Sequence, residues 1–204
     1  MPLTSNVMEL HLWHLQNLKI MAFKDDILTF EDTKIINQHD DEIMMDWEAS
    51  IMQKSAEYIC QSKGDILEIG FGMGICSDYI QAQGVNSHTI VEIHPQIIDK
   101  LKLWANGKSN VTIVEGDWYV VKDSLGTYDG IFLDTFGDDQ LDNFKAFAIA
   151  KAKSGCKISY WNNKEEEYNP HTFDSVNYEQ VSVTPSSNFY TNIASNYYMP
   201  KVVL

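Results

Sequence analysis

Four glycines and two acidic residues lie close together in the segment GDILEIGFGMGIC, residues 64–76. Gly70, Gly72 and Gly74 form a G-x-G-x-G pattern after an apolar run, and Glu68 lies two residues before the first of them. A glycine-rich turn between a strand and a helix lets a ligand approach the backbone closely, and the N–H groups of the helix favour polar or negative atoms there. The segment therefore predicts a site for a nucleotide-like ligand.

The spacing of the glycines argues against two common ligands of such loops. The dinucleotide fingerprint G-x-G-x-x-G needs its third glycine where this chain has Ile75. The segment also lacks the Lys and the Ser or Thr of a phosphate-binding P-loop. A nicotinamide or flavin dinucleotide and a nucleoside triphosphate are thus both disfavoured.

Acidic residues near the ends of three apolar runs indicate another ligand. Glu68 would attract an ammonium group better than a phosphate, and Glu92 ends the run HTIVEI, where an acid can accept hydrogen bonds from both ribose hydroxyls. Asp117 follows a third run at the height of an adenine ring, and Trp118 offers a flat surface beside it. Asp117 could instead cap a helix, and Trp118 could instead belong to the core. Together these groups predict S-adenosylmethionine as the cofactor.

These motifs resemble those of the class I methyltransferases that depend on S-adenosylmethionine, in which an acid precedes G-x-G-x-G and a second acid ends strand two. The resemblance covers about residues 64–160. The stretches MMDWEASIM (44–52), LEIGFGMG (67–74) and YDGIFLDTFGDD (128–139) are similar to guanidinoacetate N-methyltransferases and the related arginine δ-N-methyltransferases. That similarity implies that Glu48 of the Trp-Glu pair and Asp134 together hold the guanidinium of a substrate.

Asp134 is also the best catalytic candidate on the fold argument alone. It ends the run YDGIFLD, and ligand sites of open α/β sheets lie at the carboxyl ends of the strands. Two carboxylates can neutralise a planar guanidinium, orient it and accept a proton from it. Thr135 and Phe136 could close the pocket beside Asp134. The alternatives are a solvated helix residue for Glu48, a turn residue for Asp134 and ordinary loop residues for the other two.

The elements that must position these residues alternate between strand and helix. Short runs rich in β-branched and aromatic residues are separated by patterns with helical spacing, which is typical of parallel βαβ units. We therefore predict an open α/β sheet, mostly parallel, with helices on both faces and an antiparallel C-terminal hairpin. The resemblance implies that this sheet is Rossmann-like, of the class I methyltransferase type. The predicted strands are 65–69, 88–93, 111–116, 128–134 and 156–161, the hairpin strands are 178–183 and 197–204, and the predicted helices are 41–62, 76–83, 95–106 and 140–153.

The first 40 residues predict no single structure. LKIMAF and ILTFED around KDD suggest a hairpin, whereas VMELHLWHLQNL could form a helix. We expect one domain, with residues 41–204 as the methyltransferase part and residues 1–40 as an N-terminal segment that could form a lid with Trp13 and His14.

Composition limits the class of protein. The net charge of −14 would repel nucleic acid and anionic membranes, and the chain has no uninterrupted run of 18 apolar residues. Cys60, Cys76 and Cys156 show no ligand spacing, which favours a reduced, cytoplasmic chain. His11 and His14 have no third ligand at a suitable spacing, so we expect no metal.

The function that these residues favour is N-methylation of a small guanidino or amino compound, with a small molecule as the partner. One alternative is methylation of another small molecule or of an arginine in a protein. A second is a regulatory protein that binds S-adenosylmethionine or S-adenosylhomocysteine without turnover. The acidic run Glu165–Glu167 would repel a carboxylate if it faced the pocket, although a solvated run is the other interpretation.

Overall fold

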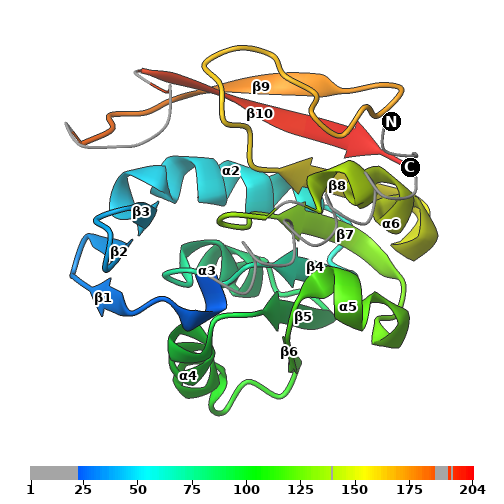
Figure 1. The fold of residues 1–204 in the computed structure, drawn as a ribbon. Helices are drawn as coiled ribbons and strands as arrows, with labels where there is room; N and C mark the ends of the chain where they lie inside the picture. Colours follow the sequence, from blue (N-terminus) through cyan, green and yellow to red (C-terminus); the bar gives the residue numbers. More distant parts are fainter. Residues whose placement is uncertain (1–22, 139, 187–192, 194) are drawn as a thin grey trace, which may run out of the picture.

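The computed structural model describes residues 23–138, 140–186, 193 and 195–204. Its centre is a seven-stranded sheet with the strand order β6-β5-β4-β7-β8-β10-β9 (Figure 1). The first five of these strands run parallel, and β10 is antiparallel to both of its neighbours. This confirms the predicted parallel sheet with its antiparallel hairpin. The strands are β4 (Asp65–Ile69), β5 (Ser87–Glu92), β6 (Val111–Glu115), β7 (Tyr128–Leu133), β8 (Ala152–Tyr160), β9 (Asn177–Ser182) and β10 (Asn196–Val203).

The order of the strands reverses between β4 and β7. From β4 the chain proceeds outward through β5 and β6, and it then crosses back to place β7 on the other side of β4. In open α/β sheets a crevice forms at such a switch point, outside the carboxyl ends of the strands. The fold therefore directs a ligand to the ends of β4, β5 and β7.

Helices cover both faces of the sheet (Figure 1). Ile66 of β4 packs in one apolar cluster with Ile51 and Met52, whereas the next residue, Leu67, packs in a second cluster with Phe144. Successive strand residues thus serve opposite helical layers, as the period of two requires. The helices are α2 (Ala49–Ile59), α3 (Ile75–Ala82) and α4 (Pro95–Ala105) on one face, and α5 (Trp118–Val121) and α6 (Phe144–Lys151) on the other, with 3-10 turns at Asp46–Glu48, Lys122–Ser124 and Leu141–Asn143.

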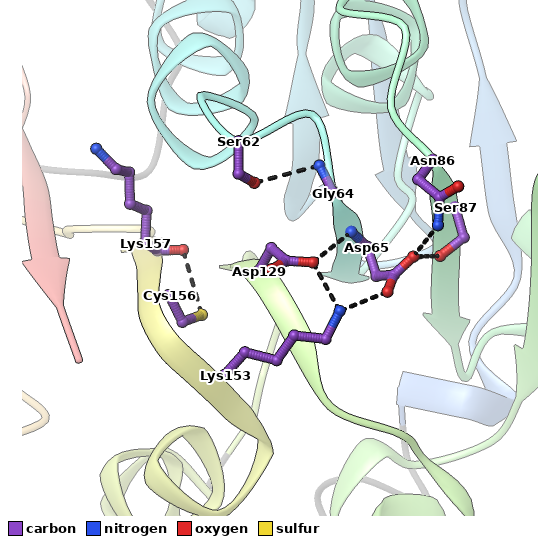
Figure 2. A network of polar contacts seen from close by, with 9 residues as sticks. All are labelled: Ser62, Gly64, Asp65, Asn86, Ser87, Asp129, Lys153, Cys156 and Lys157. Atoms are coloured by element: carbon purple, nitrogen blue, oxygen red, sulfur yellow. Dashed lines mark hydrogen bonds and ion pairs between the residues drawn. The ribbon is translucent and has the colours of Figure 1, made fainter.

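A polar network joins the amino ends of the strands, at the opposite end of the sheet from the switch point (Figure 2). The Nζ atom of Lys153 lies 2.5 Å from Asp65 Oδ2 and 2.7 Å from Asp129 Oδ2. Asp65 also accepts hydrogen bonds from Asn86 Nδ2 and Ser87 Oγ. The hydrogen bond from Lys153 is the main reason that the pKa of Asp65 is lowered to about 2. These contacts connect β4, β5, β7 and β8 below the site.

The helix expected over residues 41–62 is shorter than predicted. Glu42–Met45 form strand β3, a 3-10 turn follows, and the α-helix begins only at Ala49. β3 pairs antiparallel with β2 (Lys34–Asn37), and these backbone hydrogen bonds remove residues 42–45 from the helix. The helix expected over 140–153 likewise covers only Phe144–Lys151, because residues 152 and 153 already belong to β8.

The N-terminal hairpin also differs from the prediction. Residues 23–25 are helical, so KDD is not the hairpin turn. The hairpin is instead formed by β1 (Leu28–Phe30) and β2, and β3 completes a small antiparallel sheet. The pairing of β2 with β3 crosses the boundary expected at residue 40. Trp13, His14 and His11, with the lid and metal interpretations attached to them, lie outside the described residues.

The described part of the chain also bears on the hydropathy of the helices and on the state of the three cysteines. Its helices include none with the length and hydropathy of a transmembrane span. Cys60, Cys76 and Cys156 are all buried and form no disulfide.

Candidate active site

A cavity of about 900 Å³, including its open mouth, lies at the carboxyl ends of β4, β5 and β7. Strand ends and the loops that follow them supply most of its wall, as the switch point in the sheet requires. Gly74 and Glu48 are not part of the wall. The other residues proposed from the sequence all line it: Glu68, Gly70, Gly72, Glu92, Asp117, Trp118, Asp134, Thr135 and Phe136.

The glycine loop is shaped by contacts within the protein. Gly70, Gly72 and Gly74 have φ values of 92°, 53° and 79°, a region that side chains other than glycine rarely adopt. A Cβ atom on Gly70 would lie 1.8 Å from the carbonyl oxygen of Asp134, and one on Gly72 would lie 2.3 Å from Met44 Sδ. Because Gly70 and Gly72 have no side chain, the Asp134 carbonyl and the Met44 side chain can lie against them. The sequence argument had assigned that space to a ligand.

Glu68 lies at the back of the cavity and is 1% exposed. Its Oε2 atom accepts a hydrogen bond of 2.5 Å from Ser77 Oγ and lies 2.9 Å from His88 Nε2. The Cys76 thiol also hydrogen-bonds to this carboxylate. Glu68 lines the cavity, so its carboxylate can meet a ligand there.

Glu92 ends β5 and connects it to the glycine loop. Its carboxylate accepts backbone hydrogen bonds from Phe71, Ile93 and His94, each 2.8 to 2.9 Å long. Burial raises the pKa of Glu92, and the backbone donors oppose that shift. The backbone therefore holds this carboxylate in one orientation at the cavity wall. His94 is itself the N-cap of α4, which agrees with a structural role for this residue.

Asp117 and Trp118 each combine a structural contact with a place in the wall. Asp117 is the N-cap of α5 and accepts a hydrogen bond of 2.8 Å from the backbone N–H of Tyr119. Trp118 is 4% exposed, and its ring packs edge-on against Phe147 with centroids 4.9 Å apart. The cap and the core packing are the alternatives that the sequence left open. Both occur here together with exposure to the cavity.

Asp134, at the end of β7, and Glu48 form an acidic pair. Burial and the nearby charge of Glu68 raise the pKa of Asp134 from 3.8 to about 7. Glu48 is 6% exposed and accepts a hydrogen bond of 2.9 Å from the backbone N–H of Met45. Its pKa is raised well above 4.5, first by burial and then by the charge of Asp134. The two carboxylates are therefore close enough to interact, although only Asp134 reaches the cavity surface.

The loop after β7 is organised by Asp138, a residue to which the sequence argument assigned no chemistry. Its Oδ2 atom accepts hydrogen bonds from Thr135 Oγ1 (2.9 Å) and from Trp118 Nε1 (2.6 Å). Oδ1 accepts the backbone N–H of Gln140. Asp138 thus joins the loop after β7 to the Trp118 side of the cavity, and it lines the wall itself.

Two other lining residues come from segments without a recognisable motif. Phe23 packs against Phe136 with ring centroids 5.1 Å apart, at the edge of the cavity. Met44 lies over the glycine loop, where its Sδ atom accepts the backbone N–H of Met73 at 3.1 Å. No spacing in the sequence indicates these contacts, because both residues precede the βαβ pattern. The region of Met44 is indicated only by the resemblance over residues 44–52.

The charge of the wall has a single sign. None of the described residues that line the cavity is a Lys, Arg or His. An uncompensated group of buried carboxylates is costly unless it meets a cation. The cavity is therefore suited to cationic ligands. Its acidic residues are Glu68, Glu92, Asp117, Asp134 and Asp138.

Comparison with known proteins gives concordant results. A family model described as guanidinoacetate N-methyltransferase matches residues 22–181. Protein arginine N-methyltransferase 2 of Aspergillus oryzae is 37% identical over 149 residues, which are 69% of this chain and 36% of that protein. The protein of the same name from Candida glabrata is 40% identical over 133 residues, 58% of this chain and 31% of that one. The chain thus spans about a third of the length of these relatives.

Solved structures show the same fold at low sequence identity. Spermidine synthase from Thermotoga maritima superposes with a TM-score of 0.61 at 12% identity, covering 87% of this chain and 72% of that one. The O-methyltransferase TomG from Streptomyces achromogenes, solved in complex with SAM, gives a TM-score of 0.54 at 10% identity over 78% of this chain and 81% of its own. These similarities confirm the Rossmann-like α/β fold of class I methyltransferases.

Proposed function

This chain belongs to the guanidinoacetate N-methyltransferase family, and we propose that it transfers a methyl group from S-adenosylmethionine to a nitrogen of a guanidinium group. The observation that carries the proposal is the cavity in which every charged lining residue among those described is acidic. The donor carries a sulfonium and an ammonium group, and the acceptor carries a guanidinium. Such a wall favours this pair of ligands over phosphate-bearing nucleotides.

The residues on the β4 and β5 side of the cavity fit the donor. Glu92 presents a carboxylate that the backbone already holds in place, as recognition of a ribose diol requires. Glu68 presents its carboxylate to the ammonium group, and Trp118 with Asp117 lies where the adenine is expected. When bound, S-adenosylmethionine supplies an activated methyl group on a positively charged sulfur.

The residues at the end of β7 fit the acceptor. Asp134 can hold the guanidinium by a charge-assisted hydrogen bond and orient one nitrogen toward the donor side of the cavity. A guanidinium nitrogen becomes nucleophilic only as it loses its proton, and a carboxylate with a pKa of about 7 suits the acceptance of that proton. Glu48 adds negative charge behind Asp134. Alignment and exclusion of water then provide most of the catalysis.

The acceptor that these contacts favour is the side chain of an arginine in a polypeptide. A free guanidino acid such as guanidinoacetate also carries a carboxylate, which would need a cation or several N–H donors. Residues 161–176, which connect β8 to β9, do not line the cavity, and Glu165 is bound to the backbone N–H groups of Ser195 and Asn196. The curated relatives carry names that agree with an arginine acceptor.

A small guanidino compound is the second candidate, and the description of the matching family model favours it. A compound without a carboxylate, such as agmatine, would meet the same acidic wall as a peptidyl arginine. The two candidates differ in size. A peptidyl arginine is attached to a polypeptide, which needs room outside the cavity, whereas a small guanidino compound does not.

The test is a turnover assay with S-adenosylmethionine and four separate acceptors. These are an arginine-containing peptide, the same peptide with lysine in place of arginine, guanidinoacetate and agmatine, each analysed by mass spectrometry for the gain of one methyl group. The chain itself contains no arginine, so any methylated arginine must come from the acceptor.

We expect methylation of the arginine peptide and none of the lysine peptide. Methylation of guanidinoacetate in preference to both the peptide and agmatine would contradict our account of the wall. Tight binding of S-adenosylhomocysteine with no transfer to any acceptor would favour the non-catalytic binding protein, and binding of a nicotinamide nucleotide would favour an oxidoreductase.

A further inference from the structure

A closed hydrogen-bond network lies behind the cavity, between β4, β5 and α3. Glu68 and His88 are on adjacent parallel strands and face the same helical layer. Ser77 and Gln81 are four residues apart on α3, so they lie on one side of that helix. Ser77 and His88 are completely buried and Glu68 is 1% exposed. The mechanism above uses only Glu68 from this group.

The hydrogen bonds define the tautomer of His88. Its Nε2 atom faces the carboxylate of Glu68, which can only accept, so Nε2 carries the proton and donates. Its Nδ1 atom lies 3.2 Å from the Nε2 amide group of Gln81, which can only donate, so Nδ1 is the acceptor. Both contacts therefore fit the tautomer that carries its proton on Nε2.

This arrangement orients the Glu68 carboxylate. Ser77 and His88 both donate to Oε2, so the carboxylate is held through that oxygen at the cavity wall. Trp104 packs edge-on against the His88 ring, with centroids 6.2 Å apart, and limits the ring to this position.

We propose that His88 is a positioning residue for the donor: by donating from Nε2 to Glu68 Oε2, it directs the Glu68 carboxylate toward the ammonium group of bound S-adenosylmethionine. This inference rests on the proposed function, because it requires that donor in the cavity. It adds a residue that does not touch the donor but determines how tightly its amino-acid end is bound. Gln81 in turn orients His88, because its side-chain amide donates to His88 Nδ1.

The test compares two probes in direct binding measurements by calorimetry. S-adenosylhomocysteine carries the ammonium group, and adenosine lacks it. His88→Leu removes the donor, and His88→Gln keeps an N–H group at similar reach. We expect His88→Leu to weaken S-adenosylhomocysteine binding about tenfold and to change adenosine binding less than about twofold, in line with the loss of one charge-assisted hydrogen bond. His88→Gln should recover most of the loss.

A double-mutant cycle separates positioning from a merely structural role. In a Glu68→Gln background the ammonium contact is already weakened, so His88→Leu should cause little further loss of S-adenosylhomocysteine binding. His39→Leu, at an exposed histidine of the same chain, serves as the control and should change neither affinity.

Three results would overturn the inference. They are unchanged S-adenosylhomocysteine binding in His88→Leu, equal loss for both probes, or losses that simply add in the cycle. If His88→Leu does not fold, Gln81→Met frees Nδ1 while keeping the imidazole, and it should weaken S-adenosylhomocysteine about threefold while leaving adenosine unaffected. Unchanged affinity in that variant would equally refute the inference. Failure of the unaltered protein to bind either probe would instead refute the proposed function itself, and the inference with it.

Discussion

Replacement of Asp134 by asparagine should stabilise the unliganded protein while removing its activity. The pKa of Asp134 is raised from 3.8 to about 7, so the folded chain resists ionisation of a carboxyl group that ionises readily when the chain is unfolded. The resulting decrease in the free energy of unfolding is absent below pH 3.8, grows between pH 3.8 and 7, and is constant above pH 7. The amide of the substituted side chain carries no charge at any pH, so the variant avoids this decrease.

The size of the effect follows from the shift. About three pKa units correspond to an upper bound of about 4 kcal/mol at pH 8. Because Asp134 is partly exposed in the cavity, where solvent screens its charge, we expect about 1–2 kcal/mol. For a chain of this size that gain raises Tm by about 3–6 °C at pH 8. At pH 5 about a third of the decrease has accrued, so the gain should be about a third as large.

Thermal unfolding of both proteins at pH 5 and pH 8 measures the effect, with Asp123→Asn at an exposed position as the matched control. Equal Tm values for the Asp134→Asn variant and the unaltered protein at pH 8, or a gain that does not depend on pH, would refute the assignment of Asp134 as a strained acid. The same variant should bind S-adenosylhomocysteine with an affinity within about threefold of the original, but lose at least about 100-fold in methyl transfer. A large loss of donor affinity would show that Asp134 contacts the donor instead.

Three other substitutions test separate parts of the structure. Glu92→Ala should weaken S-adenosylhomocysteine at least about tenfold in calorimetry, because the ribose loses its acceptor, and an unchanged Kd would remove Glu92 from the donor site. Lys153→Met should destabilise the protein by about 1 kcal/mol at pH 6 in urea unfolding, a modest value because the lysine is partly exposed. The difference should shrink as the pH falls from 3.8 to about 2, the range between the ordinary pKa of Asp65 and its lowered pKa in the folded chain. A difference that does not change with pH would argue against the Asp65 contact. Gly70→Ala should cost about 3 kcal/mol or more, because its methyl group would overlap the Asp134 carbonyl, and a stable variant with normal donor binding would contradict that geometry.

The central sheet could be predicted because each parallel strand carries its own signal. Runs such as DILEI and VTIVEG are short, β-branched and bounded by turn residues, and β4 and β6 begin at the residues expected. The small N-terminal sheet could not be predicted in the same way. Glu42–Met45 have the apolar spacing of the helix that follows, and only pairing with β2 makes them a strand.

The acidic part of the site was predictable for a related reason. Parallel strands bring their carboxyl ends to one edge, so Glu68, Glu92 and Asp134 had to meet there once the strands were identified. The apolar cover was not predictable. Phe23 and Met44 reach the cavity from upstream segments whose position depends on tertiary contacts such as the hydrogen bonds between Leu28 and Gln96.

The close contact between Gly70 and the carbonyl of Asp134 limits how this protein can be redesigned. It joins the turn that would hold the sulfonium compound directly to the residue that would hold the methyl acceptor. The two proposed specificities therefore cannot be exchanged as independent modules: a loop transplanted from a methyltransferase would have to bring a glycine at position 70 or carry the end of β7 with it.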